Sequence, residues 1–140
     1  MLRSRLARDH NRERPRMDTN YPCVELCIPA DPLYVRIARL AAGDMGGRAG
    51  FSVDELDDIR LAVDEVCATL IASGGQRLEL RMQARDRALI IEGRIPDVIW
   101  VTAPTDLSAM LLRALVDSCV FTSRNGELSF EMHKFACEIV

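Results

Sequence analysis

Apolar residues follow two different periods along this chain of 140 residues. Between residues 53 and 73 they recur every three to four positions, which predicts a long helix. Between residues 77 and 84 they alternate with polar residues, which predicts a strand with one buried face. The pattern therefore predicts a chain that combines helices with strands.

Local signals mark both ends of the long helix. Ser52 and Glu55 have the spacing of a capping box, in which each side chain accepts a hydrogen bond from the backbone N–H of the other residue. The glycines at 74–75 follow the last periodic residues and end the helix.

An earlier helix is predicted over residues 32–42. It begins at Asp31-Pro32, a carboxylate cap followed by a proline suited to the first turn. Arg36 and Arg39 lie away from its apolar stripe, and residues 43–50, which hold four of the eight glycines, are interpreted as a flexible connection. The stripe consists of Leu33, Ile37, Leu40 and Ala41.

The remaining segments complete the predicted fold. Strands are expected over 23–28 and 88–95, and a third helix begins near Thr105 or Asp106. Asn125-Gly126 predicts the turn of a final β-hairpin. The order β-α-α-β-β-α-β-β favours an α+β two-layer sandwich, in which a mixed, mostly antiparallel sheet is covered on one face by three helices.

The composition is that of a globular domain, with 49% apolar and 28% charged residues. No run of 18 apolar residues is present, and the N-terminus lacks the apolar stretch of a signal peptide. We therefore expect a cytoplasmic protein with no membrane contact and one folded domain over residues 21–140.

Residues 1–20 are expected to form a disordered, arginine-rich tail. Residues 1–16 carry six arginines against Asp9 and Glu13, which gives a net charge of +4. Because the whole chain has a net charge of −3, the remaining residues carry −7. Met17 is an alternative start. A tail that bound nucleic acid would give steep salt dependence, but no aromatic residue is interleaved with the arginines, so direct nucleic-acid binding is not expected.

Five cysteines are present without the spacing of a metal site. Cys23 and Cys27 would lie about 13 Å apart on one strand, too far for a disulfide or a shared metal. We expect reduced thiols and no metal site, and a redox role of these two cysteines stays open.

Residues 62–69, Ala-Val-Asp-Glu-Val-Cys-Ala-Thr, carry a resemblance to a known family. They are similar to the pattern Ala-Val-x-Glu-x-x-x-Asn of the GHKL (Bergerat) ATPase-kinase fold. Within that fold, the chain most resembles the RsbW-like family of anti-sigma factors and serine-protein kinases. Residues 111–117 also match that family closely, and the resemblance covers about residues 21–137.

The resemblance implies an ATP site whose motifs are altered here. Glu65 matches the general base of the family, and Thr69 replaces the asparagine that coordinates Mg²⁺. Asp106 and Ser108 replace two glycines that let backbone amides approach the phosphates. A carboxylate at Asp106 would repel those phosphates.

The adenine-binding part of the site is also altered. Ile95 stands at the position of the aspartate that accepts from the adenine amino group, and Glu92 and Asp97 are its acidic neighbours. Trp100 follows in the connection that forms a lid in the family, where core packing and filling of the vacated site are the alternatives. The degenerate cofactor site would thus comprise Thr69, Glu92, Asp97 and Ser108.

The resemblance also implies partners. Arg36 matches an arginine that contacts sigma factor and anti-anti-sigma factor, and Arg39 is placed beside it. A homodimer is implied, with a sigma factor docked across the first helix. We therefore expect an anti-sigma factor, antagonised by a STAS-domain anti-anti-sigma factor, without ATP-dependent kinase activity and without a bound cofactor.

Three alternatives stay open. The chain would be an active ATP-dependent serine kinase of a STAS partner if Mg-ATP bound despite these replacements, with Glu65 as its catalytic residue. It would be a pseudokinase if it only titrated the STAS protein. Binding of nucleic acid through the tail is the third.

Overall fold

The computed structural model describes residues 2–7 and 15–137, with side chains from residue 15 onward. In chain order its elements are β1 (Leu2–Ala7), β2 (Val24–Pro29), the 3-10 turn η1 (Pro32–Tyr34), α1 (Val35–Arg48), α2 (Val53–Ile71), β3 (Arg77–Arg85), β4 (Ala88–Ile95), α3 (Asp106–Leu115), β5 (Ser118–Arg124) and β6 (Glu127–Phe135). From β2 onward this is the predicted order of strands and helices.

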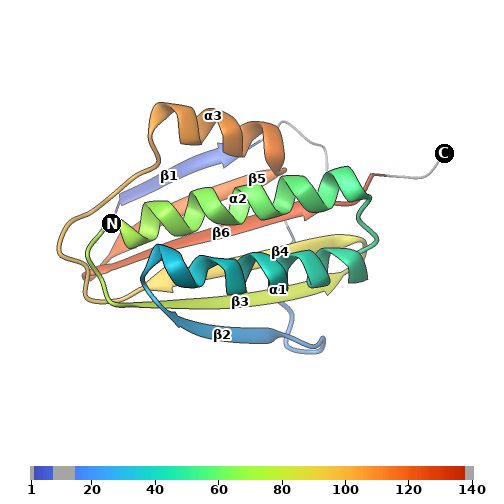
Figure 1. Cartoon of the computed structure of the whole chain (residues 1–140), viewed down its shortest axis with the longest axis horizontal. Coiled ribbons are helices and arrows are strands. Elements are labelled where there is room, and N and C mark those ends of the chain that lie inside the picture. The colour runs from blue at the N-terminus through green and yellow to red at the C-terminus, as the bar shows by residue number, and fades with distance from the viewer. Residues whose placement is uncertain (1, 8–14, 138–140) are drawn as a thin grey trace.

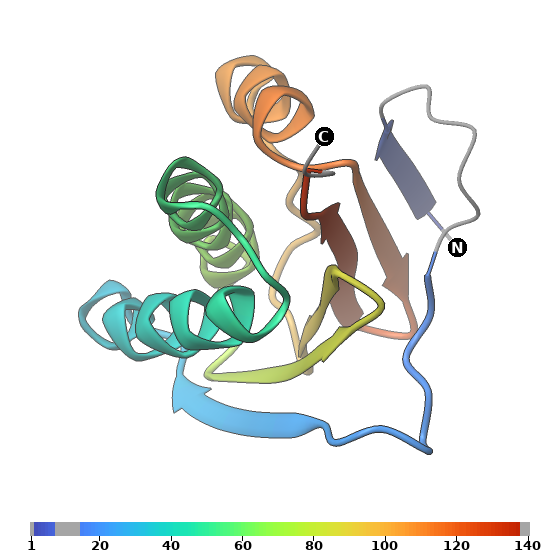
Figure 2. The same ribbon diagram turned by 90° about the vertical axis from the view of Figure 1, so that its right-hand side faces the viewer.

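The strands form one sheet in the order β1-β5-β6-β4-β3-β2, and the three helices cover one of its faces (Figures 1 and 2). The predicted two-layer α+β sandwich is confirmed. Every neighbouring pair among the described strands is antiparallel, so the sheet is more regular than the mixed one expected.

Two-residue turns account for much of this antiparallel order. Asp86 and Arg87 join β3 to β4, and Asn125 and Gly126 join β5 to β6. All four residues have positive φ, between 52° and 74°. Such turns match the twist of antiparallel strands. The hairpin predicted from Asn125-Gly126 is therefore confirmed.

The core lies between the sheet and the helices. Leu78, Leu80 and Met82 on β3 are at most 2% exposed, as the alternation predicted. Removing such a side chain from water contributes about 1.5–3 kcal/mol. The other large side chains that are fully buried are Ile59, Leu70, Leu89, Ile91, Ile95, Leu112, Leu128, Phe130 and Met132.

Helix α1 extends through the glycines that we interpreted as a flexible connection, so that interpretation was wrong. Close packing against α2 explains the difference. A Cβ at Gly46 would lie 2.8 Å from side-chain atoms of both Phe51 and Leu56, and one at Gly43 would lie 2.9 Å from Arg60 Nε. Glycine in α1 thus serves a tight contact between helices rather than flexibility.

The N-terminal residues also differ from expectation. Leu2–Ala7 form β1 and pair with β5 along six residues, although residues 1–20 were expected to be disordered. Residues 8–14 lie outside the described part. The physical reason is that the edge of β5 has backbone donors and acceptors that pair with a further strand. The prediction of disorder was based on charge and did not take this pairing into account.

Candidate functional site

A hydrogen bond in the helical layer joins two of the predicted site residues. The Ser108 hydroxyl donates a hydrogen bond to the Glu65 carboxylate, across the interface of α3 and α2. Ser108 is held in place because its backbone N–H donates to the Thr105 hydroxyl, the N-cap of α3, at 3.1 Å. The group at the general-base position therefore already has a partner within the chain.

Thr69 lies one turn after Glu65 and is also internally bonded. Its hydroxyl donates to the Glu65 carbonyl within α2 at 3.0 Å, and its own carbonyl accepts from the Thr102 hydroxyl at 2.6 Å. Thr69 is only 7% exposed. A hydroxyl bonded back to its own helix is poorly placed to ligate Mg²⁺, which demands near-octahedral oxygen ligands.

The connection between β4 and α3 lies against the end of α2. The backbone N–H groups of Ile99 and Trp100 both donate to the Ser73 carbonyl, at 2.8 and 3.2 Å. The Trp100 indole N–H donates to the Ala72 carbonyl at 2.7 Å. Trp100 is nevertheless 59% exposed, so it neither packs in the core nor fills a vacated site, contrary to both alternatives.

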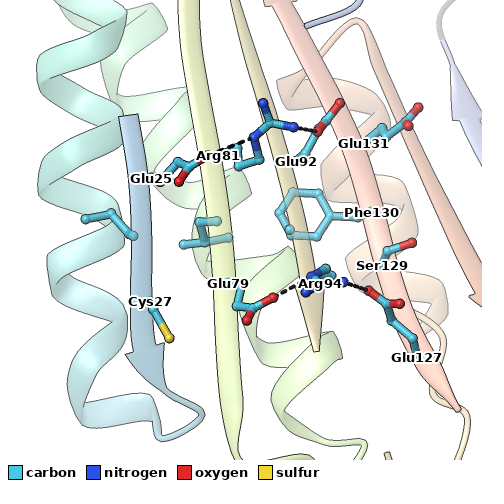
Figure 3. A pocket seen from close by; sticks show the side chains of 13 residues that line it. Glu25, Cys27, Glu79, Arg81, Glu92, Arg94, Glu127, Ser129, Phe130 and Glu131 are labelled. Carbon is cyan, nitrogen blue, oxygen red and sulfur yellow. Dashed lines mark hydrogen bonds and ion pairs between the residues drawn. The ribbon is translucent and has the colours of Figure 1, made fainter. Parts of the chain in front are cut away.

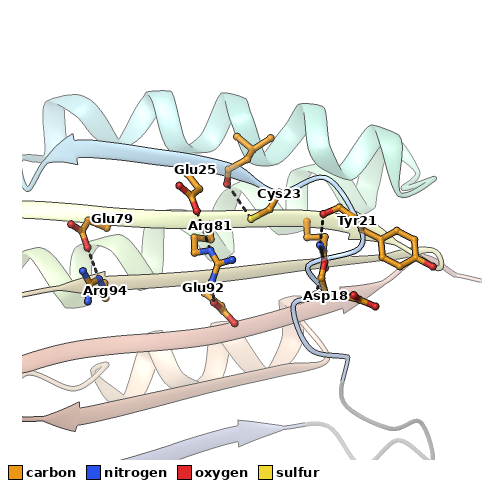
Figure 4. Close-up of polar contacts among 10 residues, drawn as sticks. Asp18, Tyr21, Cys23, Glu25, Glu79, Arg81, Glu92 and Arg94 are labelled. Atoms are coloured by element: carbon orange, nitrogen blue, oxygen red, sulfur yellow. Dashed lines mark hydrogen bonds and ion pairs between the residues drawn. The ribbon is translucent and has the colours of Figure 1, made fainter.

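The structure separates Glu92 from the other predicted cofactor residues. Glu92 lies on the face of the sheet opposite the helices, where it pairs with Arg81 at 3.6 Å (Figure 3 and Figure 4). Asp97 follows β4 and is exposed, with φ 55°. Within the described residues no hydrogen bond joins Asp97 to Glu65, Thr69 or Ser108. Only the last three therefore form one cluster.

Asp106 occupies the first turn of α3 and is exposed. A carboxylate there compensates the helix macrodipole, so a structural role accounts for it. Ile95 is fully buried, and its side chain occupies the space that a Cβ at Gly75 would need. Both residues therefore serve packing and helix formation, at two of the positions for which the resemblance predicted altered nucleotide contacts.

The two predicted partner-binding arginines differ. Arg39 pairs with Asp64 at 3.3 Å and ties α1 to α2. Burial raises the pKa of Asp64, and Arg39 partly offsets this. Arg36 is exposed, and no ion pair engages it within the described residues. Of the two arginines, Arg36 is thus the one that is free to meet a partner.

Sequence reasoning missed one surface, the apolar stripe of η1 and α1. The stripe that indicated the helix faces solvent: Leu33 is 83% exposed, Ile37 46% and Leu40 61%, with Tyr34 beside them at 43%. The buried side of α1 is made of Ala38, Ala42, Gly43, Met45 and Gly46. All of these residues except Met45 are small, and they recur at helical spacing. In the sequence, this pattern indicates a close helix contact on that side, with the bulky stripe pointing outward.

The described residues contain no group of three His, Cys, Asp or Glu side chains that could hold a metal ion. None of the described helices is long and apolar enough to cross a membrane.

Comparison with known proteins finds sequence similarity to serine-protein kinases named RsbW. The chain is 36% identical over 55 residues to the serine-protein kinase RsbW of Bacillus velezensis and, over the same length, to that of Bacillus subtilis. It is 36% identical over 53 residues to the RsbW of Oceanobacillus iheyensis. Over these stretches the chain is similar to the RsbW proteins.

This RsbW-like chain matches its relatives over a limited length. The aligned stretch covers 39% of this chain and 34% of the Bacillus proteins, so it spans about a third of the relatives' length. No family model matches the chain. The similarity to RsbW proteins is therefore limited to this stretch.

The Ser108–Glu65 bond gives a first prediction. Ser108→Ala is expected to lower the free energy of unfolding by about 1–2 kcal/mol, because it leaves the half-buried Glu65 carboxylate without its donor. Urea unfolding measures this. The control is Ser129→Ala, whose hydroxyl makes only a 3.4 Å contact and whose loss should cost less than about 0.5 kcal/mol. Equal effects would contradict a specific role of Ser108.

Glu92 gives a second prediction, on pH dependence. Burial raises the pKa of Glu92, the neighbouring Glu131 raises it further, and Arg81 lowers it. The ionised carboxylate therefore destabilises the fold, and this cost appears as pH rises from the unfolded pKa through the higher folded one. We expect the stability of Glu92→Gln relative to the wild type to rise as the pH increases from about 4 to 7 in urea unfolding, and a constant difference would contradict this.

Proposed function

We propose that this RsbW-like chain is a regulatory protein that acts by binding a sigma factor, and that it works without ATP-dependent phosphate transfer. The observation that carries the proposal is the solvent-facing stripe Leu33, Ile37 and Leu40. Exposed apolar side chains that line up along one helix indicate a protein-binding surface. Arg36 adds a charged group that suits an acidic residue of the partner.

The contacts of Glu65 support the second half of the proposal. A general base needs a substrate proton and an in-line phosphate within reach. Here the carboxylate accepts from Ser108, and the Thr69 hydroxyl is bonded within α2. The proposal further includes antagonism by a STAS-domain anti-anti-sigma factor that competes for the same stripe.

A homodimer is part of this proposal. Strand β2 lies at the edge of the sheet, with one side unpaired among the described strands. An edge of this kind can pair with a second copy. The β2 edge and the stripe on η1 and α1 follow one another directly along the chain.

The competing function is an active serine kinase of a STAS partner. It is favoured by the similarity to proteins named serine-protein kinases and by the presence of Glu65 at the general-base position. For this function, Mg-ATP would have to displace two contacts to α2: the Ser108 hydroxyl from the Glu65 carboxylate, and the Thr102 hydroxyl from the Thr69 carbonyl.

One experiment separates the two. The purified chain is tested against each sigma factor and each STAS protein of its source organism, produced singly, with and without Mg-ATP. Equal binding of one sigma factor in both conditions supports the proposal. Phosphate transfer to a STAS protein, lost in Glu65→Gln, would establish the kinase instead. Binding of no sigma factor would overturn the proposal.

A further inference from the structure

Helix α2 ends with carbonyl groups that need hydrogen-bond donors, because the last carbonyls of a helix have no partner within it. The residues that follow α2 supply N–H groups for some of them, at 3.1–3.2 Å. The carbonyls served in this way are those of Ala68, Leu70 and Ile71. The carbonyls of residues 69, 72 and 73 accept from another segment of the chain.

That segment is the connection between β4 and α3, residues 96–105, which passes the end of α2 (Figure 1). Ile99, Trp100 and Thr102 together donate four hydrogen bonds to the three carbonyls. The Thr102 hydroxyl and the Trp100 indole N–H donate at 2.6 and 2.7 Å, and the two backbone N–H groups donate at 2.8 and 3.2 Å. The carbonyls of residues 68–73 therefore all have donors within the chain.

Other contacts fix the connection along its length. The Val98 N–H donates to the Gly126 carbonyl, in the turn between β5 and β6, at 3.0 Å. Thr105 at the other end is the N-cap of α3. Ile99 packs on the glycine that follows α2, because a Cβ at Gly74 would lie 2.8 Å from the Ile99 Cδ1 atom. A side chain at position 74 would therefore push the connection away from α2.

Hydrogen bonds rather than apolar burial hold the connection in place. Ile99, Trp100 and Val101 are 66%, 59% and 53% exposed, so their side chains gain little from leaving water. The indole N–H is the single donor of a tryptophan side chain, and here it is used on the Ala72 carbonyl. Trp100 thus donates both a backbone and a side-chain hydrogen bond to neighbouring carbonyls, which phenylalanine could not do.

We propose that the connection is held closed on α2 by the donors of the chain itself, with Trp100 as the residue that fixes it, so that a nucleotide adds nothing to its closure. The four bonds already occupy the carbonyls at the end of α2. Because the connection is fixed, its exposed apolar side chains keep one arrangement whether or not a ligand is bound. The inference rests neither on the sigma factor nor on the loss of kinase activity.

Amide hydrogen exchange of the full chain, followed residue by residue by NMR, tests this. Two variants each remove one side-chain donor and keep a side chain of similar shape: Trp100→Phe and Thr102→Val. We expect exchange of the Ile99 N–H to accelerate roughly fivefold or more in the first and roughly threefold or more in the second, because each lost bond favours local opening. Added Mg-ATP should leave the wild-type rate unchanged.

Two controls separate opening of the connection from general loosening of the fold. The Ala136 N–H donates to the Arg87 carbonyl at 2.8 Å, at the other end of β4 and β6, and its exchange should not change in either variant. Val101→Ala shortens an exposed side chain of the same connection without removing a donor, so it should leave Ile99 exchange unchanged.

Three results would overturn the proposal. The first is unchanged Ile99 exchange in both donor variants, which would show that these bonds do not hold the connection. The second is an equal acceleration at Ala136, which would show that the variants loosen the whole fold. The third is slower Ile99 exchange of the wild type in Mg-ATP, since a nucleotide would then complete the closure.

Discussion

Leu40→Asp is expected to weaken binding of the proposed sigma-factor partner by roughly 30-fold or more while leaving the fold intact. Leu40 lies in the middle of α1 and is 61% exposed, so the fold does not need its side chain in the core. In the proposed complex it would be buried, and an aspartate there would have to give up its hydration without a partner. Calorimetric titration of the purified sigma factor measures the loss.

The matched control for Leu40 lies on another helix. Leu107 on α3 is 66% exposed, so Leu107→Asp introduces the same charge at a similar exposure. It should change the affinity by less than about threefold. Arg36→Glu should reduce binding as well, because it reverses the charge beside the stripe. If Leu40→Asp and Leu107→Asp bind equally well, the stripe on α1 is not the docking surface.

Lys134→Met is expected to lower the free energy of unfolding by about 3 kcal/mol, with a fall in Tm of about 10 °C. Lys134 is the single lysine of the chain, and its side chain is 8% exposed. Its ammonium donates to the Leu115 carbonyl at the end of α3 at 2.7 Å and lies 3.7 Å from Asp58 on α2. It thus links β6 to two helices, and methionine would leave the carbonyl without its donor.

An exposed ion pair provides the comparison for Lys134. Arg48 and Asp44 approach to 2.8 Å, closer than Lys134 and Asp58, but both are about two-thirds exposed. Arg48→Met should therefore cost less than about 0.5 kcal/mol, because water screens the pair. Thermal and urea unfolding give both values. A loss below about 1 kcal/mol in Lys134→Met would show that the buried contact does not stabilise the packing of the helices.

Local interactions explain why so many elements were predictable. The capping box at Ser52 and Glu55 forms as expected, with contacts of 3.2 and 2.9 Å. The β3 alternation and the Asn125-Gly126 turn are equally local, because each depends on residues within a few positions. The part of the candidate site that was predicted correctly is also local, because Glu65 and Thr69 lie one turn apart on the same helix.

Several features needed contacts between distant segments, and local patterns could not supply them. Glu92 and Ile91 are neighbours in sequence, yet one faces the open side of the sheet and the other the core, so closeness to a motif did not place Glu92 in the site. The Ser108–Glu65 bond joins residues 43 positions apart. The pairing of β1 with β5 spans most of the chain.

The sequence alone therefore determined the order of elements from residue 21 onward, the two-layer fold and the altered residues at the nucleotide positions, because these follow from local period, caps and turns. The tertiary structure decided which side of each helix and strand faces the core and which side faces solvent. It turned the α1 stripe to solvent, because small residues at 38, 42, 43 and 46 allow the close approach of α2. It also paired Leu2–Ala7 with β5, because backbone donors and acceptors at a strand edge can bond to a distant segment in a way that composition does not encode.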